Sequence, residues 1–231
     1  GGVYANKKNI TIDIEVDNTL CDNLYYSWTS ASDNVPVKAM PSNYYTLSDN
    51  KITLNNVLMN GVEVSFTDAF FADPEALTST YVIPLVMTGV TNADRILNGT
   101  LSEGAEAVRC NSSVWLVQPQ DYVLYCVKYI NKWTGKYLRH GVDKVTENGE
   151  TTVNDRRNEY VEDDEICQTT TKSLTETILT VTTNLGTADN PRNIDYQLLL
   201  TFNGDECAVS GLGGITATGT GKFVQDGEKN S

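Results

Sequence analysis

The chain has 231 residues, with 17 basic and 30 acidic side chains and a formal net charge of −13. So acidic a chain lacks the cationic surface that displaces counterions from phosphates, which excludes non-specific nucleic-acid binding. The same charge argues against docking on anionic lipid through a basic patch. The length suits two domains of roughly 110 residues, each large enough to bury a core.

Alternating apolar and polar residues predict β-strands from the start of the chain. In the segment 10–16, Ile and Val alternate with Thr, Asp and Glu, which indicates a strand with one solvated face. Two shorter alternating runs, 52–54 and 62–66, flank Asn60-Gly61, a turn signal. The first half of the chain therefore reads as β-structure.

The longest apolar run is Tyr81–Met87, far short of the roughly 20 residues of a membrane-spanning helix. A continuous apolar run of this length is typical of a strand covered on both faces. Pro84 lacks a backbone N–H, so we expect this strand at a sheet edge or a bulge. Before it, Asp73-Pro74 predicts a short helix, with Asp73 as N-cap and Pro74 at the first helical position.

The second half repeats the β pattern with longer strands. The segments 122–130, 174–183 and 194–202 are rich in β-branched and aromatic residues, and Asn148-Gly149 predicts the tip of a hairpin. Gln118-Pro119-Gln120 is a plausible domain boundary. The sequence therefore predicts an all-β protein with domains at 1–118 and 119–231.

Sequence motifs for catalysis are weak. The five cysteines form no CxxC pair, which excludes zinc ribbons and thioredoxin-like motifs; we expect mostly buried free thiols, with one or two disulfides left open. His140 is the only histidine and no G-x-S-x-G motif frames a serine, so a serine hydrolase lacks support. The glycine-rich segment 211–222 matches neither the P-loop nor the dinucleotide-binding pattern. We therefore expect no enzyme, no cofactor and no metal site.

Aromatic residues are the better candidates for ligand binding, because exposed rings stack on the apolar faces of sugars while Asn, Asp and Arg bond the hydroxyl groups. Half or more of the tyrosines should instead fill the β cores. Two clusters follow predicted strands and supply the candidate ligand-binding residues Tyr25, Tyr26, Trp28, Trp133, Tyr137 and Arg139.

Two long blocks of the chain resemble a known family. The segment Leu47–Tyr81, within the stretch that includes "YYTLSDNKITL", "GVEVSFTDAFFADPEAL" and "YVIPLVMTGV", resembles an N-terminal domain of unknown function in surface lipoproteins of gut Bacteroidetes. The segment Gln118–Asp143, "QPQDYVLYCVKYINKWTGKYLRHGVD", resembles the start of the second, uncharacterised domain of the same lipoproteins. Such proteins are typically encoded beside SusC/SusD-like outer-membrane glycan importers.

The resemblance implies an immunoglobulin-like β-sandwich for the first domain. The string Trp133–Tyr137 is similar to the opening strand of lipocalin-like barrels, where a glycine permits a sharp bend beside an aromatic plug. For the second domain we therefore expect an antiparallel β-barrel, with a second sandwich as the alternative. The resemblance also predicts further strands beyond Gly227–Ser231, so the second domain is expected to be C-terminally incomplete.

The resemblance further implies an exported lipoprotein at the outer membrane or cell surface, or facing the periplasm, held by a lipid anchor outside this sequence. We expect it to bind a glycan without catalysis, as an accessory to polysaccharide uptake, with importer components as further partners. Its acidity favours neutral glycans. The alternatives are an adhesion module that binds a protein through β-sheet edges, and a glycoside hydrolase, which 30 acidic residues cannot exclude.

Overall fold

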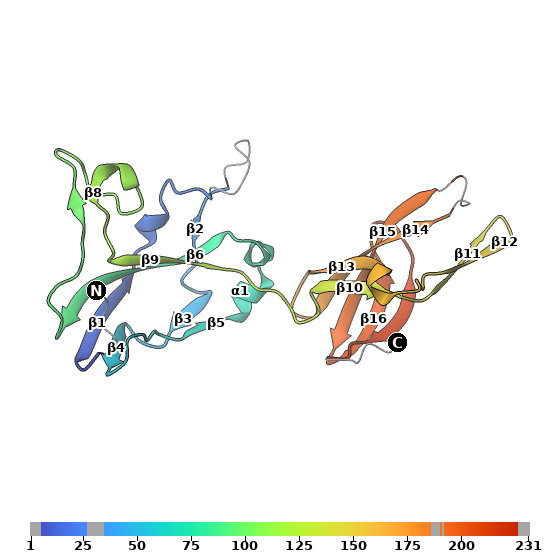
Figure 1. The fold of residues 1–231 in the computed structure, drawn as a ribbon, viewed down its shortest axis with the longest axis horizontal. Coiled ribbons are helices and arrows are strands. Elements are labelled where there is room, and N and C mark those ends of the chain that lie inside the picture. Colours follow the sequence, from blue (N-terminus) through green and yellow to red (C-terminus); the bar gives the residue numbers. More distant parts are fainter. Residues whose placement is uncertain (1–5, 27–34, 186–189, 191, 226–231) are drawn as a thin grey trace. The chain divides into compact units, whose positions relative to one another are not determined.

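The computed structural model describes residues 6–26, 35–185, 190 and 192–225. Among these, the helices are α1 (Asp68–Ala72) and the short 3-10 helices η1 (Asn18–Cys21), η2 (Pro74–Leu77), η3 (Ser112–Val114) and η4 (Val161–Asp163). Every other regular element is a strand, which confirms the all-β prediction (Figure 1). No helix in the described part of the chain is long and apolar enough to cross a membrane.

The chain divides into two compact units, Gly1–Tyr129 and Ile130–Ser231. This division falls beyond the predicted boundary after residue 118. The reason is that the strand predicted to open the second domain, β9 (Tyr122–Val127), pairs with β6 (Tyr81–Thr91) along Tyr81–Val86. β9 therefore completes the sheet of the first unit.

The main sheet of the first unit has five strands around β6. β1 (Asn9–Val16) and the parallel strand β2 (Lys38–Ala39) share one side of β6, β9 takes the other, and β4 (Lys51–Asn55) pairs with β1. Two smaller two-stranded sheets accompany it, β3–β5 (Tyr45–Leu47, Val64–Phe66) and β7–β8 (Thr100–Leu101, Trp115–Val117).

β6 is buried on both faces, as its apolar run predicts. Tyr81, Ile83 and Leu85 join a core with α1 and the β3–β5 sheet, whereas Val82 joins a second core on the opposite face. The expectation that Pro84 places this strand at an edge is wrong, because β6 is the central strand. The Pro84 carbonyl accepts from the Asp17 N–H on the side of β1 and β2, so the missing proline N–H faces the same side. It falls between the end of β2 pairing at Val82 and the start of β1 pairing at Leu85, where no ladder bond is lost.

Two local signals are confirmed, the cap at Asp73 and the turn at Asn148-Gly149, whereas Asn60-Gly61 forms no assigned turn and the strands on either side of it, β4 and β5, pair with β1 and β3 instead of with each other. The Asp73 side chain accepts from the Glu75 N–H at 2.9 Å and caps η2, whose first residue is Pro74. Asn148 and Gly149 have positive φ values of 53° and 86° and form the tip between β11 (Val142–Glu147) and β12 (Glu150–Asp155). Both features are set by neighbours in sequence, which explains why they were predictable.

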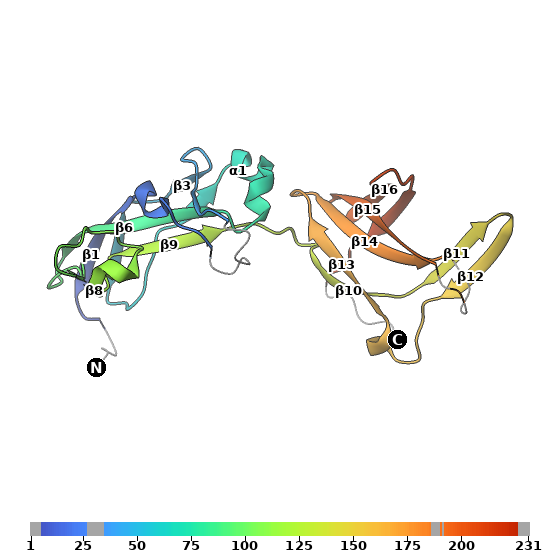
Figure 2. The same ribbon diagram turned by 90° about the horizontal axis from the view of Figure 1, so that it is seen from above.

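The second unit is a curved, open antiparallel sheet of six strands, a half-barrel (Figure 2). Its strands follow the order β10-β13-β14-β15-β16-β17, and β10 and β17 are its two edges. Their bounds are Gly135–Arg139, Glu165–Thr171, Glu176–Asn184, Asn193–Asn203, Glu206–Gly211 and Thr218–Lys222. The β11–β12 hairpin lies outside this sheet.

Candidate functional site

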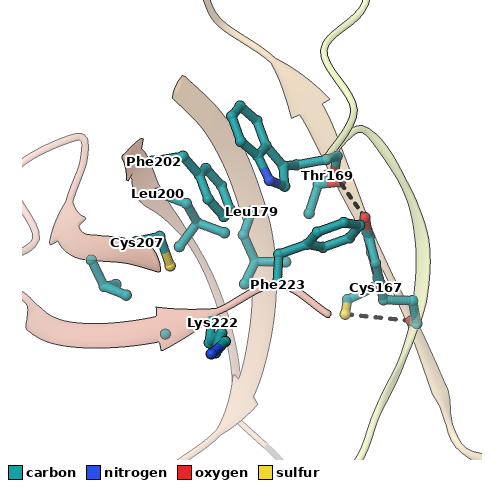
Figure 3. Close-up of a pocket in the computed structure, with 12 residues that line it drawn as sticks. Cys167, Thr169, Leu179, Leu200, Phe202, Cys207, Lys222 and Phe223 are labelled. Atoms are coloured by element: carbon teal, nitrogen blue, oxygen red, sulfur yellow. Dashed lines mark hydrogen bonds between the residues drawn. The ribbon is translucent and has the colours of Figure 1, made fainter. Parts of the chain in front are cut away.

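A cavity of about 280 Å³ lies on the inner face of the half-barrel (Figure 3). All six strands contribute to its lining, since cross-strand pairs such as Tyr137 with Cys167 and Phe202 with Cys207 place their side chains on one face. Four aromatic residues line it, Trp133, Tyr137, Phe202 and Phe223, together with aliphatic side chains from β14 to β16. The inner surface of the half-barrel therefore lines a mostly apolar cavity.

Asn131 fixes the turn that carries Trp133 into this cavity. Its buried side-chain amide donates to the carbonyls of Ser173 and Glu176 at 2.9 and 3.0 Å. Its carboxamide oxygen accepts from the Trp133 N–H at 3.2 Å, and its own N–H donates to Thr171 Oγ1 at 3.0 Å. These bonds tie the loop before β10 to β13 and β14.

Trp133 is only 7% exposed and stacks face to face on Phe202, with ring centroids 4.0 Å apart and an interplanar angle of 7°. Its carbonyl accepts from Thr169 Oγ1 at 2.6 Å and from the Tyr137 hydroxyl at 3.0 Å. Its indole Nε1 is buried and finds no acceptor among the described residues. Trp133 thus packs against Phe202 in the lining of the cavity, and its indole N–H has no acceptor among the described residues.

Two thiols and one phenol of the lining, those of Cys167, Cys207 and Tyr137, are held in their neutral forms. Burial raises the pKa of the Cys167 and Cys207 thiols, with Arg139 and the Gly221 N–H opposing this in part. Burial also raises the pKa of the Tyr137 phenol. At neutral pH these groups add no charge, and the described lining contains no carboxylate.

Two lysines lie beside the rings. Lys132 Nζ is 5.2 Å from the centroid of Trp133 and 5.7 Å from that of Phe223, and it pairs with Asp205 at 2.6 Å. Lys222, which lines the cavity, pairs with Glu206 at 3.5 Å. All four charged side chains of these two pairs are more than half exposed, so we place them at the solvent side of the site.

Of the six predicted ligand-binding residues, Trp133 and Tyr137 come together at the cavity. Trp133 is buried, however, so the expected exposed stacking platform is wrong for this residue, because Phe202 covers one face of its ring. Tyr26 is also buried, with its hydroxyl 3.2 Å from Cys126 Sγ, whereas Tyr25 is 51% exposed in the first unit. Trp28 lies outside the described residues.

Arg139 faces a set of ion pairs instead of the cavity. It pairs with Asp143 at 3.1 Å and with Glu165 at 3.5 Å, and it donates to the Thr182 carbonyl at 2.8 Å. Arg156, from the end of the β11–β12 hairpin, pairs with the same two carboxylates, at 2.5 Å in each case. Two cations balanced by two anions fasten the hairpin to the sheet, which is a structural role.

His140 pairs with a buried carboxylate. Its Nδ1 lies 3.0 Å from Asp164 Oδ2, and the other Asp164 oxygen accepts from the Asn158 N–H at 3.0 Å. Both bonds lower the pKa of Asp164, the His140 bond more strongly. Within the described residues no Ser, Thr or Cys is hydrogen bonded to His140, so a catalytic trio does not form around it.

Sequence reasoning missed Asn131, Thr169, Phe202 and Phe223 as site residues. One signal was present for Phe202, which shares a face with Ile194, Tyr196, Leu198 and Leu200 in the period-two pattern of β15. The other three gave none, because their positions in the site depend on strand pairing across the sheet.

All five cysteines are free, but only Cys21 is fully buried and Cys126 is exposed, so the expectation of mostly buried thiols holds only in part.

Comparisons with known proteins give two matching family models. The model of a domain of unknown function, DUF5627, matches residues 132–231, and a model described as an N-terminal domain matches residues 1–94. No curated protein matches the chain.

Solved structures from Bacteroides match as well. A protein of unknown function from Bacteroides ovatus is 41% identical, with a TM-score of 0.87 over 100% of this chain and 72% of that one. An auxiliary nutrient binding protein from Bacteroides thetaiotaomicron is 14% identical, with a TM-score of 0.40 over 89% of this chain and 58% of that one. A multidomain protein including DUF1735 from Bacteroides ovatus is 12% identical, with a TM-score of 0.37 over 95% of this chain and 79% of that one. On the strength of the first match, this chain belongs to the same family as the Bacteroides ovatus protein of unknown function.

Proposed function

We propose that the protein is a non-catalytic binding protein of the cell surface or periplasm that holds part of a glycan in the half-barrel cavity, as an accessory to polysaccharide uptake. The accessory role and the lipid anchor rest on the resemblance to lipoproteins encoded beside SusC/SusD-like importers. The binding role rests on the cavity itself.

One observation carries the proposal: the cavity of about 280 Å³ is lined by aromatic and aliphatic side chains from one connected sheet. Concave, mostly apolar sites with a few polar groups are typical of small-molecule binding. Tyr137, 36% exposed, is the ring best placed to contact a sugar outside the cavity.

The chemistry of the lining supports binding without catalysis. A glycoside hydrolase needs two carboxyl groups that face each other across the substrate, and the described lining has none. The Cys167 and Cys207 thiols, kept neutral by burial, are weak nucleophiles.

Calorimetry of the full chain against a panel of neutral and acidic glycans tests the proposal. Substituting Tyr137→Ala should weaken binding of the best glycan about tenfold, because it removes an aromatic contact. Tyr160→Ala is the matched control, since Tyr160 is 57% exposed and does not line the cavity. Absence of binding across the panel, or equal loss in both variants, would refute the proposal.

A second candidate function, adhesion to a protein partner, is favoured by β9. Among the residues that the structure describes, this strand pairs only with β6, so no described strand covers its other edge, and Val123 and Tyr125 are 39% and 55% exposed. Together with Ile12, Ile52 and Leu85 they line an apolar groove of about 120 Å³. Co-purification with importer components that Tyr125→Lys abolishes and Tyr160→Lys preserves would support this function over glycan binding.

A further inference from the structure

We infer that the first unit carries a binding site for a neutral sugar ring, in a cavity lined by Asn98, Arg109 and Trp115. The inference goes beyond the proposed function, because this site is separate from the half-barrel cavity and its own lining sets the ligand class. All of its lining comes from one stretch of the chain, residues 98–121.

The mixed character of the cavity is the first step. Its volume is about 340 Å³, within the range of roughly 300–1,000 Å³ that small-molecule sites occupy. The lining combines an indole ring, an uncharged amide, a guanidinium group and a carboxylate, from Trp115, Asn98, Arg109 and Asp121. It therefore offers both an apolar surface and hydrogen-bonding groups to one ligand.

The indole ring of Trp115, which is half-buried, is fixed in place. Its Nε1 donates to the Val108 carbonyl at 2.9 Å. Gly99, with a positive φ of 78°, brings the backbone against the ring, since a Cβ atom there would lie 3.0 Å from Trp115 Cε3. Because the indole N–H is already satisfied, the ring offers a ligand carbon surface, on which the apolar face of a sugar can stack.

Arg109 is oriented by a buried carboxylate. Its Nε donates to the two oxygens of Asp121 at 3.3 and 3.2 Å, and its Nη2 lies 3.2 Å from Oδ2. Asp121 is 2% exposed, and the Tyr122 hydroxyl donates to the Arg109 carbonyl at 3.1 Å. The guanidinium group is planar, so Nη1 points away from the carboxylate that holds the other two nitrogens.

Donors and acceptors for hydroxyl groups remain available in this lining. Within the described part of the chain, neither Arg109 Nη1 nor the exposed side chain of Asn98 makes a hydrogen bond. Nη1 supplies donors, and the carboxamide of Asn98 supplies both donors and an acceptor. A sugar ring uses these groups and the indole together, whereas a purely apolar ligand leaves the polar groups unused.

The charges around the cavity favour a neutral sugar over an acidic one. Arg109 is balanced by Asp121, and Asp22 lines an adjoining cavity of about 300 Å³ that Arg109 also lines. The net charge of the chain is −13. The carboxylate of a uronic acid would therefore lose water without meeting excess positive charge, which opposes its binding.

A titration of the full chain followed by ¹H–¹⁵N spectra tests the inference. The probes are the methyl glycosides of glucose, galactose and mannose and those of the corresponding uronic acids. We expect at least one neutral glycoside to move the Trp115 indole signal saturably, and its uronic acid counterpart to bind more weakly. An indole signal that no neutral glycoside moves, or equal binding of the two members of a pair, would overturn the inference.

Asn98→Ala should weaken binding of that glycoside roughly threefold to tenfold, the range that one net hydrogen bond gives. Asn154→Ala is the matched control, since Asn154 is exposed on β12 and does not line the cavity. Trp115→Ala should weaken binding about tenfold or more, because it removes the stacking surface. If Trp115→Ala fails to fold, Asn98→Ala decides the matter, and unchanged affinity in it contradicts the inference.

Tyr137→Ala, in the half-barrel, separates this site from the proposed function and should leave the response of Trp115 to the glycoside unchanged. If Tyr137→Ala weakens binding of a glycan but no probe moves the Trp115 signal, the inference fails and the proposed function stands. If the Trp115 signal responds as expected but no glycan is sensitive to Tyr137→Ala, the half-barrel proposal fails and the Trp115 site stands.

Discussion

Asn131 and Trp133 show how one buried amide can position a residue of the cavity lining. The Asn131 side chain uses both its donor and its acceptor on β14 and on the turn itself, including Thr177 Oγ1 at 3.1 Å. Amide side chains that satisfy several buried backbone groups are costly to remove, because their partners are left unpaired. Asn131 therefore stabilises the unit and aims the Trp133 ring.

Asn131→Ala should lower the free energy of unfolding by about 2–4 kcal/mol, since it leaves several buried groups without partners. Chemical denaturation of the full chain measures this. Asn154→Ala, at an exposed position of β12, is the control and should change stability by less than about 0.5 kcal/mol. A small effect at Asn131 would mean that the turn is held by other contacts.

The single residue Asp164 also predicts how the free energy of unfolding depends on pH. Its hydrogen bonds with His140 and with the Asn158 N–H hold the pKa of its carboxyl below the usual value, which is about 3.9. A pKa that is lower in the folded than in the unfolded state adds stability above the usual pKa, and this stability is lost as the pH falls through the folded value.

Asp164→Asn should therefore flatten the fall of unfolding free energy below about pH 4. Thermal denaturation at a series of pH values from neutral downwards checks this. Asp163→Asn, at an exposed neighbour, should leave the slope as it is in the unmodified protein. An unchanged slope in Asp164→Asn would show that other carboxylates govern acid unfolding.

At the scale of elements, the strand ends shape the half-barrel. β16 ends at Gly211, opposite Leu198 of β15, and the chain then turns through Gly213 and Gly214 with positive φ values of 64° and 85°. A Cβ atom at Gly211 would lie 1.9 Å from the carbonyl oxygen of Ile215. Glycine is required there because two backbone segments approach closely.

Gly211→Ala should destabilise the protein by about 1–3 kcal/mol or more, because the Ile215 backbone must move away. Urea denaturation measures the loss. The comparison is Gly61→Ala, since a Cβ at Gly61 meets no atom within 4 Å. Equal stability of the two variants would contradict the close approach at Gly211.

At the scale of the whole molecule, β9 and the residues after it decide where the first unit ends. Beyond β9, the Tyr129 hydroxyl donates to the Phe71 carbonyl at 2.9 Å. The backbone N–H of Tyr129 donates to the Ala76 carbonyl at 3.1 Å. A boundary after residue 118 removes these contacts and leaves one side of β6 without a partner.

A fragment of residues 1–129 should therefore unfold cooperatively, whereas a fragment of residues 1–118 should be unfolded or aggregate through the free edge of β6. Circular dichroism during heating, together with size-exclusion chromatography, compares the two. Similar cooperative unfolding of both fragments would show that β9 is dispensable.

Much of the fold was predictable because it depends on neighbours in sequence. The strand β1, the cap at Asp73 and the hairpin tip at Asn148-Gly149 are all confirmed. The position of Pro84 in the central strand was not predictable from the sequence. The effect of its missing N–H depends on which strands lie beside β6. The burial of Trp133 likewise depends on Phe202, which stacks on it from β15.

The sequence by itself determined the all-β character and the turns, and it pointed to Trp133 and Tyr137, because period-two patterns and local caps act within a few residues. Only the tertiary structure decided that these rings share a cavity with Phe202 and Phe223, that Trp133 Nε1 is left without an acceptor, and that His140 pairs with Asp164. Each of these depends on which distant strands and loops meet, and that is set by packing of the whole sheet, which no local pattern records.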